Sequence, residues 1–399
     1  MDVSARSGHA DYEWFITLNR ACLGLLGIWP ETNDRNERRR WKTNARVIIL
    51  LTLIICTCTI PTFHSLIRIW GNITSMIDNL QYSLPLTMST LKLVLMWRKK
   101  NVLIQILKMV EEDWTRLKTE KERAIMIKCA QTARLLMIWG FFVMFVTFIL
   151  VVIFPTFGVS LRYLTNITDP GRLMPLQTYY MYNVNDSPFY EMTFVLQSIS
   201  LIIAAATYTS TDTFMSFLIF HVCGQLENLK ARILDLEFNR FAGSLSSNVR
   251  EHIRLIRSIK LIDDTFTLML LGLLIYFGML FALYGFLFVT IMTQGRNLSI
   301  ARLIYILTSF INTFTHMCLY CVVGEFLVIQ CNGIYDAVCQ YKWYNLESRQ
   351  TRNLLTMMIQ AKKPMYLTAG KLFPMTMATF CGLLKTSGGY ISVLLAHRN

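Results

Sequence analysis

The sequence predicts an all-α membrane protein with seven transmembrane helices, and its hydropathy is the first reason. Of the 399 residues, 54% are hydrophobic and only 16% are charged, a balance that soluble domains do not show. The second reason is that the charges are clustered, which leaves stretches long enough to cross a hydrocarbon core about 30 Å thick. The third reason is that basic residues and glycosylation acceptors fall in alternate connections, as they do in a chain that crosses a membrane repeatedly.

Four spans follow from length and apolar composition alone. Each is almost free of charged residues, and a helix rises about 1.5 Å per residue, so each is long enough to cross the bilayer. These spans are residues 47–67, 135–154, 266–292 and 303–330.

Three further spans carry polar residues: residues 75–97, 188–222 and 373–396. In the first, we expect the long side chain of Lys92 to carry its ammonium out to the membrane interface. The second is longer than a bilayer requires, so we expect it to extend into the cytosol. The third contains Lys385 and several Gly and Thr residues, and therefore needs protein or water around it.

The distribution of Lys and Arg predicts the orientation, because basic loops are retained in the cytosol. Of 39 such residues, 8 lie in residues 1–46, 10 in 98–134, 7 in 223–263 and 6 in 331–372. The connections on the opposite side contain few. The N-terminus is therefore predicted to be cytosolic and the C-terminus extracellular.

Glycosylation acceptors of the form Asn-x-Ser/Thr provide an independent signal, because they are used only where the chain faces the secretory lumen. All four lie in the connections that are poor in basic residues. The predicted acceptors are Asn72, Asn166, Asn185 and Asn297.

The same reasoning divides the chain into four regions. Residues 1–46 form a cytosolic N-terminal segment, and residues 47–330 form a six-helix transmembrane bundle with cytosolic helical extensions. Residues 331–372 form a cytosolic helical anchor region, and residues 373–399 contain the seventh helix and a short extracellular tail. The extensions below the second and fourth spans are predicted from apolar residues that repeat at helical spacing within charged sequence.

Catalytic and metal-binding motifs are missing from the sequence, which contains no phosphate-binding loop, no nucleophile elbow and no paired zinc ligands. His64, His221 and His316 are isolated, so we expect them to act as interhelical hydrogen-bonding groups. No enzyme activity, cofactor, metal or external disulfide is expected. The net charge of +14 follows from topology and anionic lipid, so no nucleic-acid partner is needed.

The C-terminal third carries a dense motif that resembles the signature of the insect odorant receptors. The resemblance covers residues 324–395, where the matching residues have the family's order and spacing. Upstream, only the topology and the span lengths match. The matching residues are Gly324, Glu325, Gln330, Ala337, Trp343, Tyr344, Arg352, Lys363, Pro364, Thr368, Ala369, Gly370, Phe373, Thr379, Phe380, Leu384, Lys385, Thr386, Ser387 and Tyr390.

The resemblance implies a ligand-gated non-selective cation channel in the plasma membrane of an olfactory sensory neuron. It also implies a heterotetramer, in which an odour-tuned subunit joins the odorant receptor coreceptor around one pore. The coreceptor has a longer loop between its fourth and fifth spans, whereas residues 223–263 form a loop of only about 40 residues. The chain therefore resembles a tuned subunit.

In the family, the seventh helix lines the pore and carries an apolar gate near its outer end. Alignment on Tyr390 places the first gate position at Val393 and the next turn at His397. His397 departs from the apolar residue that the family often has there. From composition alone, small polar residues such as Gly382 and Thr386 suit either a pore helix or a packed core.

The resemblance also implies a pocket for small volatile molecules in the outer half of the bundle. Such a pocket binds by burial, at about 25 cal/mol per Å² of apolar area, and Tyr hydroxyls add orientation. The same side chains also serve as packing residues and interface belts. The candidates are Tyr82, Leu86, Phe145, Phe148, Leu201, Ala205, Tyr276, Leu280, Tyr284 and Phe310.

Three other classes of membrane protein fit the sequence less well. A gustatory-type receptor channel of the same superfamily is the nearest alternative. A G-protein-coupled receptor has the opposite orientation, and its Asp-Arg-Tyr and Asn-Pro-x-x-Tyr sequences are missing here. A transporter is expected to show internal repeats with paired broken helices, and the two halves of this chain do not resemble each other.

Overall fold

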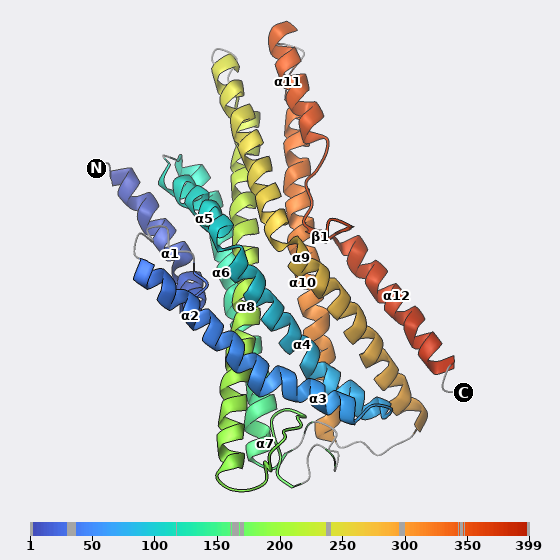
Figure 1. The fold of residues 1–399 in the computed structure, drawn as a ribbon. Helices are drawn as coiled ribbons and strands as arrows, with labels where there is room; N and C mark the ends of the chain where they lie inside the picture. Colours follow the sequence, from blue (N-terminus) through green and yellow to red (C-terminus); the bar gives the residue numbers. More distant parts are fainter. Residues whose placement is uncertain are drawn as a thin grey trace.

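Long helices run side by side through the molecule and form a bundle (Figure 1). The computed structural model describes residues 3–29, 37–116, 118–159, 161, 167, 171–236, 241–294, 300–341, 343, 346 and 348–396. Within these, two of the predicted spans are interrupted by a π-helical turn. The first consists of α2 (Glu37–Ile54), η1 (Ile55–Thr59) and α3 (Ile60–Arg68), and the third consists of α6 (Glu120–Phe148), η2 (Ile149–Ile153) and α7 (Phe154–Thr156). The other five spans are α4 (Ile73–Arg98), α8 (Phe189–Leu234), α9 (Phe241–Gln294), α10 (Ile300–Gln340) and α12 (Met377–Ala396).

Five of these segments are long and apolar enough to cross a membrane by length and composition. The other two, α4 and α12, carry polar residues for different reasons. Helix α4 buries its polar side chains inside the bundle, among them Asp78, Asn79 and Lys92. Helix α12 instead exposes Lys385 and Thr386. A hydropathy average does not distinguish these two arrangements, because it ignores which face of a helix is covered.

Helices α8, α9 and α10 continue well beyond the length that a bilayer requires. Two shorter helices lie beside or follow these extensions: α5 (Lys100–Thr115) and α11 (Ser348–Ala361). The apolar spacing that predicted helical extensions after the second and fourth spans falls in α5 and at the end of α8.

Helix α1 (Val3–Leu25), which was not predicted, lies against α5 and α8. Its central contact is Phe15, which is buried with its ring stacked 4.1 Å from that of Phe217 on α8. The ring of Trp114 on α5 lies 5.2 Å from the same Phe15 ring. Aromatic pairs at these separations attract each other beyond their area burial, so α1 is tied to the extensions.

The seventh helix begins four residues later than predicted, at Met377 rather than at Phe373. Phe373–Pro374 forms the short strand β2, which pairs antiparallel with β1, Thr368–Ala369. The turn between them has a positive φ of 63° at Gly370. Proline lacks a backbone donor and restricts the residue before it to extended conformations, so a helix does not start at Phe373.

The hairpin and α10 together fix the start of α12. A Cβ added at Gly324 on α10 would lie only 2.0 Å from the carbonyl oxygen of Met375, so the two backbones are in direct contact. Next to it, the Glu325 carboxylate accepts a hydrogen bond of 3.1 Å from the Met377 backbone N–H. Because the first N–H groups of a helix have no partner within it, this carboxylate serves as a cap from another helix.

Candidate functional site

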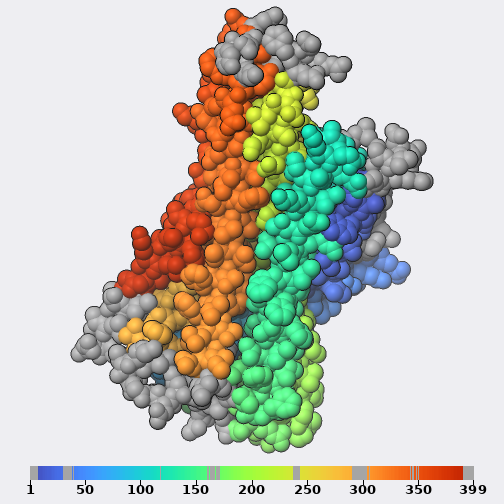
Figure 2. All heavy atoms as spheres, turned by 180° about the vertical axis from the view of Figure 1, so that it is seen from behind, coloured from blue at the N-terminus to red at the C-terminus, as the bar shows by residue number. Residues whose placement is uncertain are grey.

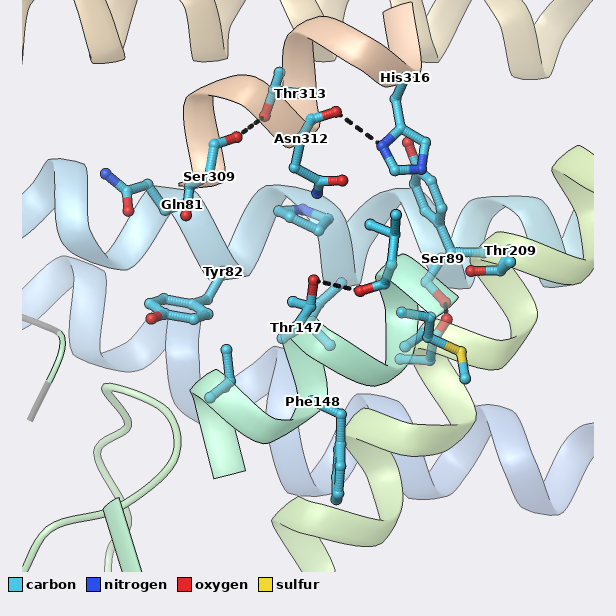
Figure 3. Close-up of a pocket in the computed structure, with 18 of the residues that line it drawn as sticks. Gln81, Tyr82, Ser89, Thr147, Phe148, Thr209, Ser309, Asn312, Thr313 and His316 are labelled. Atoms are coloured by element: carbon cyan, nitrogen blue, oxygen red, sulfur yellow. Dashed lines mark hydrogen bonds between the residues drawn. The ribbon is translucent and has the colours of Figure 1, made fainter. Parts of the chain in front are cut away.

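A cavity of about 220 Å³ lies among five helices of the bundle (Figure 3). Pockets for drug-sized molecules are larger, roughly 300–1,000 Å³, so this cavity suits a smaller ligand. Its lining comes from residues 81–89 of α4, 140–152 of α6 and η2, 201–209 of α8, 276–284 of α9 and 308–316 of α10.

Eight of the ten residues predicted for ligand binding lie in this lining. They come from four helices that are far apart in the sequence, and most present an apolar or aromatic surface. Contact with a ligand remains a prediction for each of them. The eight are Tyr82, Leu86, Phe148, Leu201, Ala205, Tyr276, Leu280 and Tyr284.

Phe145 and Phe310 are the two candidates that lie outside the lining. Phe145 is exposed on the outer face of α6, whereas Thr147 and Phe148 of the same helix face the cavity. Phe310 packs its ring at 6.2 Å from Phe281, behind the cavity wall. Residues three apart on an α-helix differ by about 60° in direction, so at the edge of the face turned to the cavity Phe148 lines it while Phe145 does not.

The sequence reasoning missed a polar stripe on α10 that forms one wall of the cavity. Ser309, Asn312, Thr313 and His316 all belong to the lining. Their spacing of three, four and seven residues places them on one face of the helix. This spacing in an otherwise apolar span was the signal that would have found them.

His316 and Asn312 have defined geometry within this stripe (Figure 3). The His316 Nδ1 lies 2.9 Å from the Asn312 backbone oxygen, one turn earlier on α10. The Asn312 side-chain amide has no protein partner among the described residues, and in Figure 3 it extends from α10 across the cavity. Two hydrogen-bonding groups of one helix are thus directed at the same space.

Lys92 does not extend to the membrane interface as predicted. Its side chain is fully buried, and its Nζ lies 2.6 Å from Asp212 Oδ1 on α8 and 3.2 Å from the Tyr320 hydroxyl on α10. The same Nζ lies 3.2 Å from the ring centroid of Tyr208, which lines the cavity. A buried charge needs a partner of opposite sign, and Asp212 supplies it from 120 residues away.

Because Asp212 pairs with Lys92, it does not pair with the lysine of the seventh helix. Lys385 is exposed on α12. The Lys92–Asp212 pair joins α4 to α8 directly next to the cavity, and the Tyr320 hydroxyl adds α10. Movement of any of these helices therefore changes the surroundings of a buried charge.

A second buried polar cluster joins α5, α8 and α9 in the extensions. Asp113 Oδ2 lies 3.0 Å from His221 Nε2, and Asp113 Oδ1 lies 2.7 Å from an Arg254 guanidinium nitrogen. Burial opposes ionisation of Asp113, but the hydrogen bond with His221 and the charge of Arg254 outweigh it and hold the pKa of that carboxyl below its ordinary value.

Of the remaining predicted sites, two glycosylation acceptors can be placed. Asn72 is exposed and caps α4, where its side-chain oxygen accepts from the Ser75 backbone N–H at 3.2 Å. Asn185 is half-buried in the connection before α8, where its side-chain oxygen accepts from the Arg172 backbone N–H at 3.4 Å. Asn166, Asn297 and His397 lie outside the described residues. The backbone of Val393 belongs to α12.

Comparisons with known proteins agree with this architecture. A family model described as 7tm Odorant receptor matches residues 72–388, which is most of the chain. The chain belongs to this odorant receptor family. The resemblance that the C-terminal motif indicated is therefore confirmed, and the match extends through the cavity and the buried Lys92 pair.

Two curated relatives are odorant receptors of insects. The chain is 25% identical over 228 residues to Odorant receptor 13a of Drosophila melanogaster, covering 51% of this chain and 53% of the relative. It is 26% identical over 238 residues to Odorant receptor Or2 of Anopheles gambiae, covering 56% of this chain and 61% of the relative. The chain thus spans little more than half the length of the curated relatives it matches.

Solved structures show the same fold at lower sequence identity. The olfactory receptor OR5 of Machilis hrabei superposes with a TM-score of 0.81 at 14% identity, covering 96% of this receptor and 99% of that chain. The complex of OR5 with eugenol gives a TM-score of 0.80 at 14% identity, covering 97% and 99%. This likeness confirms the predicted all-α fold with seven transmembrane helices.

Proposed function

We propose that this receptor is the odour-tuned subunit of a ligand-gated non-selective cation channel. The observation that carries the proposal is the cavity among α4, α6, α8, α9 and α10, which is concave, largely apolar and small. These are the properties of a site that binds small volatile molecules by shape and burial. The related OR5 has been solved in complex with eugenol, a small molecule of this kind.

The proposed partner is the odorant receptor coreceptor, in a heterotetramer around one pore. Helix α12 supports this assembly because it packs against α9 and α10 on one side and is open on the other. Figure 2 shows it along the edge of the molecule, beside α10. Its open face exposes Gly382, Lys385 and Thr386, a surface that lipid does not satisfy.

We assign the pore to this open face of α12, with a gate at Val393 and the following turn at His397. The receptor is proposed to lie in the plasma membrane of an olfactory sensory neuron as a multi-pass protein, with its N-terminus in the cytosol and its C-terminus outside. Asn72, Asn166, Asn185 and Asn297 are the proposed glycosylation acceptors. The segregation of Lys and Arg into residues 1–46, 98–134, 223–263 and 331–372 supports this orientation.

Recording of cation current tests the proposal. Cells that co-express the receptor with an insect coreceptor are expected to pass current when a volatile panel is applied, and cells that express the receptor alone are not. Ala205→Phe, which places a ring in the cavity, is expected to abolish the current or to change which volatile molecules evoke it. Ile202→Phe on the exposed face of the same helix is the control and should leave it unchanged. A response without any coreceptor would contradict the proposed assembly.

A further inference from the structure

Gln81 on α4 is a buried polar residue that the fold leaves without a partner. Its side chain lines the cavity, the residue is only 6% exposed, and neither amide atom has a hydrogen-bond partner among the described residues. A buried amide in this state destabilises the folded protein unless another molecule supplies the hydrogen bonds. Figure 3 places Gln81 on the same side of the cavity as Ser309.

His316 offers the cavity a lone pair. Because its Nδ1 lies 2.9 Å from a backbone carbonyl oxygen, which only accepts, the hydrogen of the neutral ring is held at Nδ1. The other ring nitrogen, Nε2, is then an acceptor. A ligand group that satisfies it must donate a hydrogen.

Asn312 differs from His316 because its amide both donates and accepts. It lies one turn from His316 on the wall of the cavity, and it has no protein partner among the described residues. A group that donates to the histidine and accepts from the amide satisfies both residues at once. Among small neutral volatile molecules, the hydroxyl group does so with a single oxygen.

We infer that this receptor is tuned to neutral hydroxylated odorants, alcohols or phenols, whose hydroxyl lies between Asn312 and His316. The inference rests on the proposed function, since it takes the cavity to be the ligand site. The body of the ligand lies against the apolar side chains of Leu86, Phe148 and Leu280. Where the ligand has a second polar group, that group forms a hydrogen bond with the Gln81 amide.

Other ligand classes leave groups of this cavity unsatisfied. Ethers, esters and ketones accept hydrogen bonds but do not donate to His316, and hydrocarbons satisfy none of the polar groups. Ammonium and carboxylate ligands lose their hydration without finding a free counter-ion, because the Lys92 charge close to the cavity is already paired with Asp212. Sites built to bind a hydroxyl reject analogues that lack it far more strongly than they reject a change of one methylene.

Matched probes test the inference by binding, independently of channel opening. The full receptor, purified from cells that co-express the coreceptor, is heated with benzyl alcohol or with ethylbenzene, which has a methyl group in place of the hydroxyl. Phenol against toluene, and n-hexanol against n-heptane, extend the comparison, and benzyl methyl ether and methyl benzoate represent acceptors that do not donate. A ligand that binds the folded state raises the midpoint of thermal unfolding.

We expect alcohols or phenols to bind at least about tenfold more tightly than their matched analogues. Asn312→Leu and His316→Phe are each expected to remove this preference while leaving hydrocarbon binding unchanged or stronger. Asn332→Leu is the matched control on the same helix, because Asn332 is exposed and lies outside the cavity lining.

The result also distinguishes this inference from the channel assignment. Equal binding of hydroxylated probes and their analogues, or a preference that survives both Asn312→Leu and His316→Phe, overturns the inference even if odorants evoke current. A preference for the hydroxyl in a protein that passes no odour-evoked current would support the inference and contradict the channel function. A panel in which no alcohol or phenol binds overturns the inference directly.

Discussion

Lys92 and Asp212 form an ion pair next to the cavity, with the fully buried Lys92 Nζ 2.6 Å from Oδ1 of the mostly buried Asp212. The pair joins the second and fourth spans, and the lysine ammonium is shielded from solvent. Breaking a buried pair by removing one partner costs about 3–5 kcal/mol, because the remaining charge is left uncompensated. The pair is therefore expected to hold α4 and α8 in register.

Lys92→Met is the first predicted variant. We expect it to lower the thermal midpoint and the yield of folded receptor strongly, and to do so more than the double variant Lys92→Met with Asp212→Leu, which removes both charges. The comparison pair is Arg20 and Glu13 on α1, whose side chains are 45% and 38% exposed. This exposed pair should contribute at most about 1 kcal/mol to the free energy of unfolding. Equal midpoints for the single and double variants would show that the uncompensated charge is not the cause.

The Asp113 cluster predicts a dependence of stability on pH. The folded protein holds the pKa of Asp113 below its unfolded value, so the cluster stabilises the fold above that unfolded value, about 3.9. The stabilisation is lost as the pH falls through the lower folded pKa. Thermal midpoints between about pH 5 and pH 3 should therefore fall more steeply for the natural protein than for Asp113→Asn. The same change at exposed Asp235 serves as the control, and parallel curves for all three proteins would refute the assignment.

Gly324 permits the contact that positions α12, because any Cβ there would lie 2.0 Å from the Met375 carbonyl oxygen. Gly324→Ala is expected to displace the hairpin and to break the Glu325 cap on Met377. Odour-evoked current should be lost, and the thermal midpoint of the receptor should fall.

Gly382→Ala provides the matched control on α12 itself. No described atom lies within 4 Å of a Cβ at this position, and replacing a helical glycine by alanine stabilises a helix by roughly 0.5–1 kcal/mol. The midpoint of thermal unfolding of the Gly382→Ala receptor should stay unchanged or rise slightly. If both variants behave alike, the close contact at Gly324 does not position α12.

Four of the seven spans could be predicted because long apolar runs determine them locally. The other three carry polar residues, and the alternation of basic connections with glycosylation acceptors supported them. The position of Lys92 could not be predicted, because its partner Asp212 lies 120 residues away and a lysine near a span end has a simpler solution at the interface. The hairpin before α12 was missed because helix and strand patterns are ambiguous over a few residues, although Pro374 indicated that the helix starts later.

The depth of the candidate cavity in the spans could be predicted from the sequence, but the face of each helix that turns to the cavity could not. Tyr82 and Leu280 were placed from their depth in the spans, whereas of the two predicted phenylalanines of α6 only Phe148 lines the cavity and Phe145 is exposed. Excluding Phe145 required knowing which face α6 turns to α8. The polar wall of Asn312 and His316 was visible in the spacing, but only apolar and aromatic residues had been considered.

Val393 provides the final prediction, which tests the proposed pore. An apolar constriction closes a channel because water leaves it and ions do not enter without water. Val393→Asp places a carboxylate there, so the closed channel is expected to stay wet and to pass a standing cation current without odorant. Val393→Ile keeps the position apolar and should retain a closed state without leak. The measurement is the holding current of receptor and coreceptor together, before and after a channel blocker. If Val393→Asp shows the same leak and conductance as the natural receptor, Val393 does not contribute to the gate, and the pore-lining role of α12 must then be tested at the next turn, at His397.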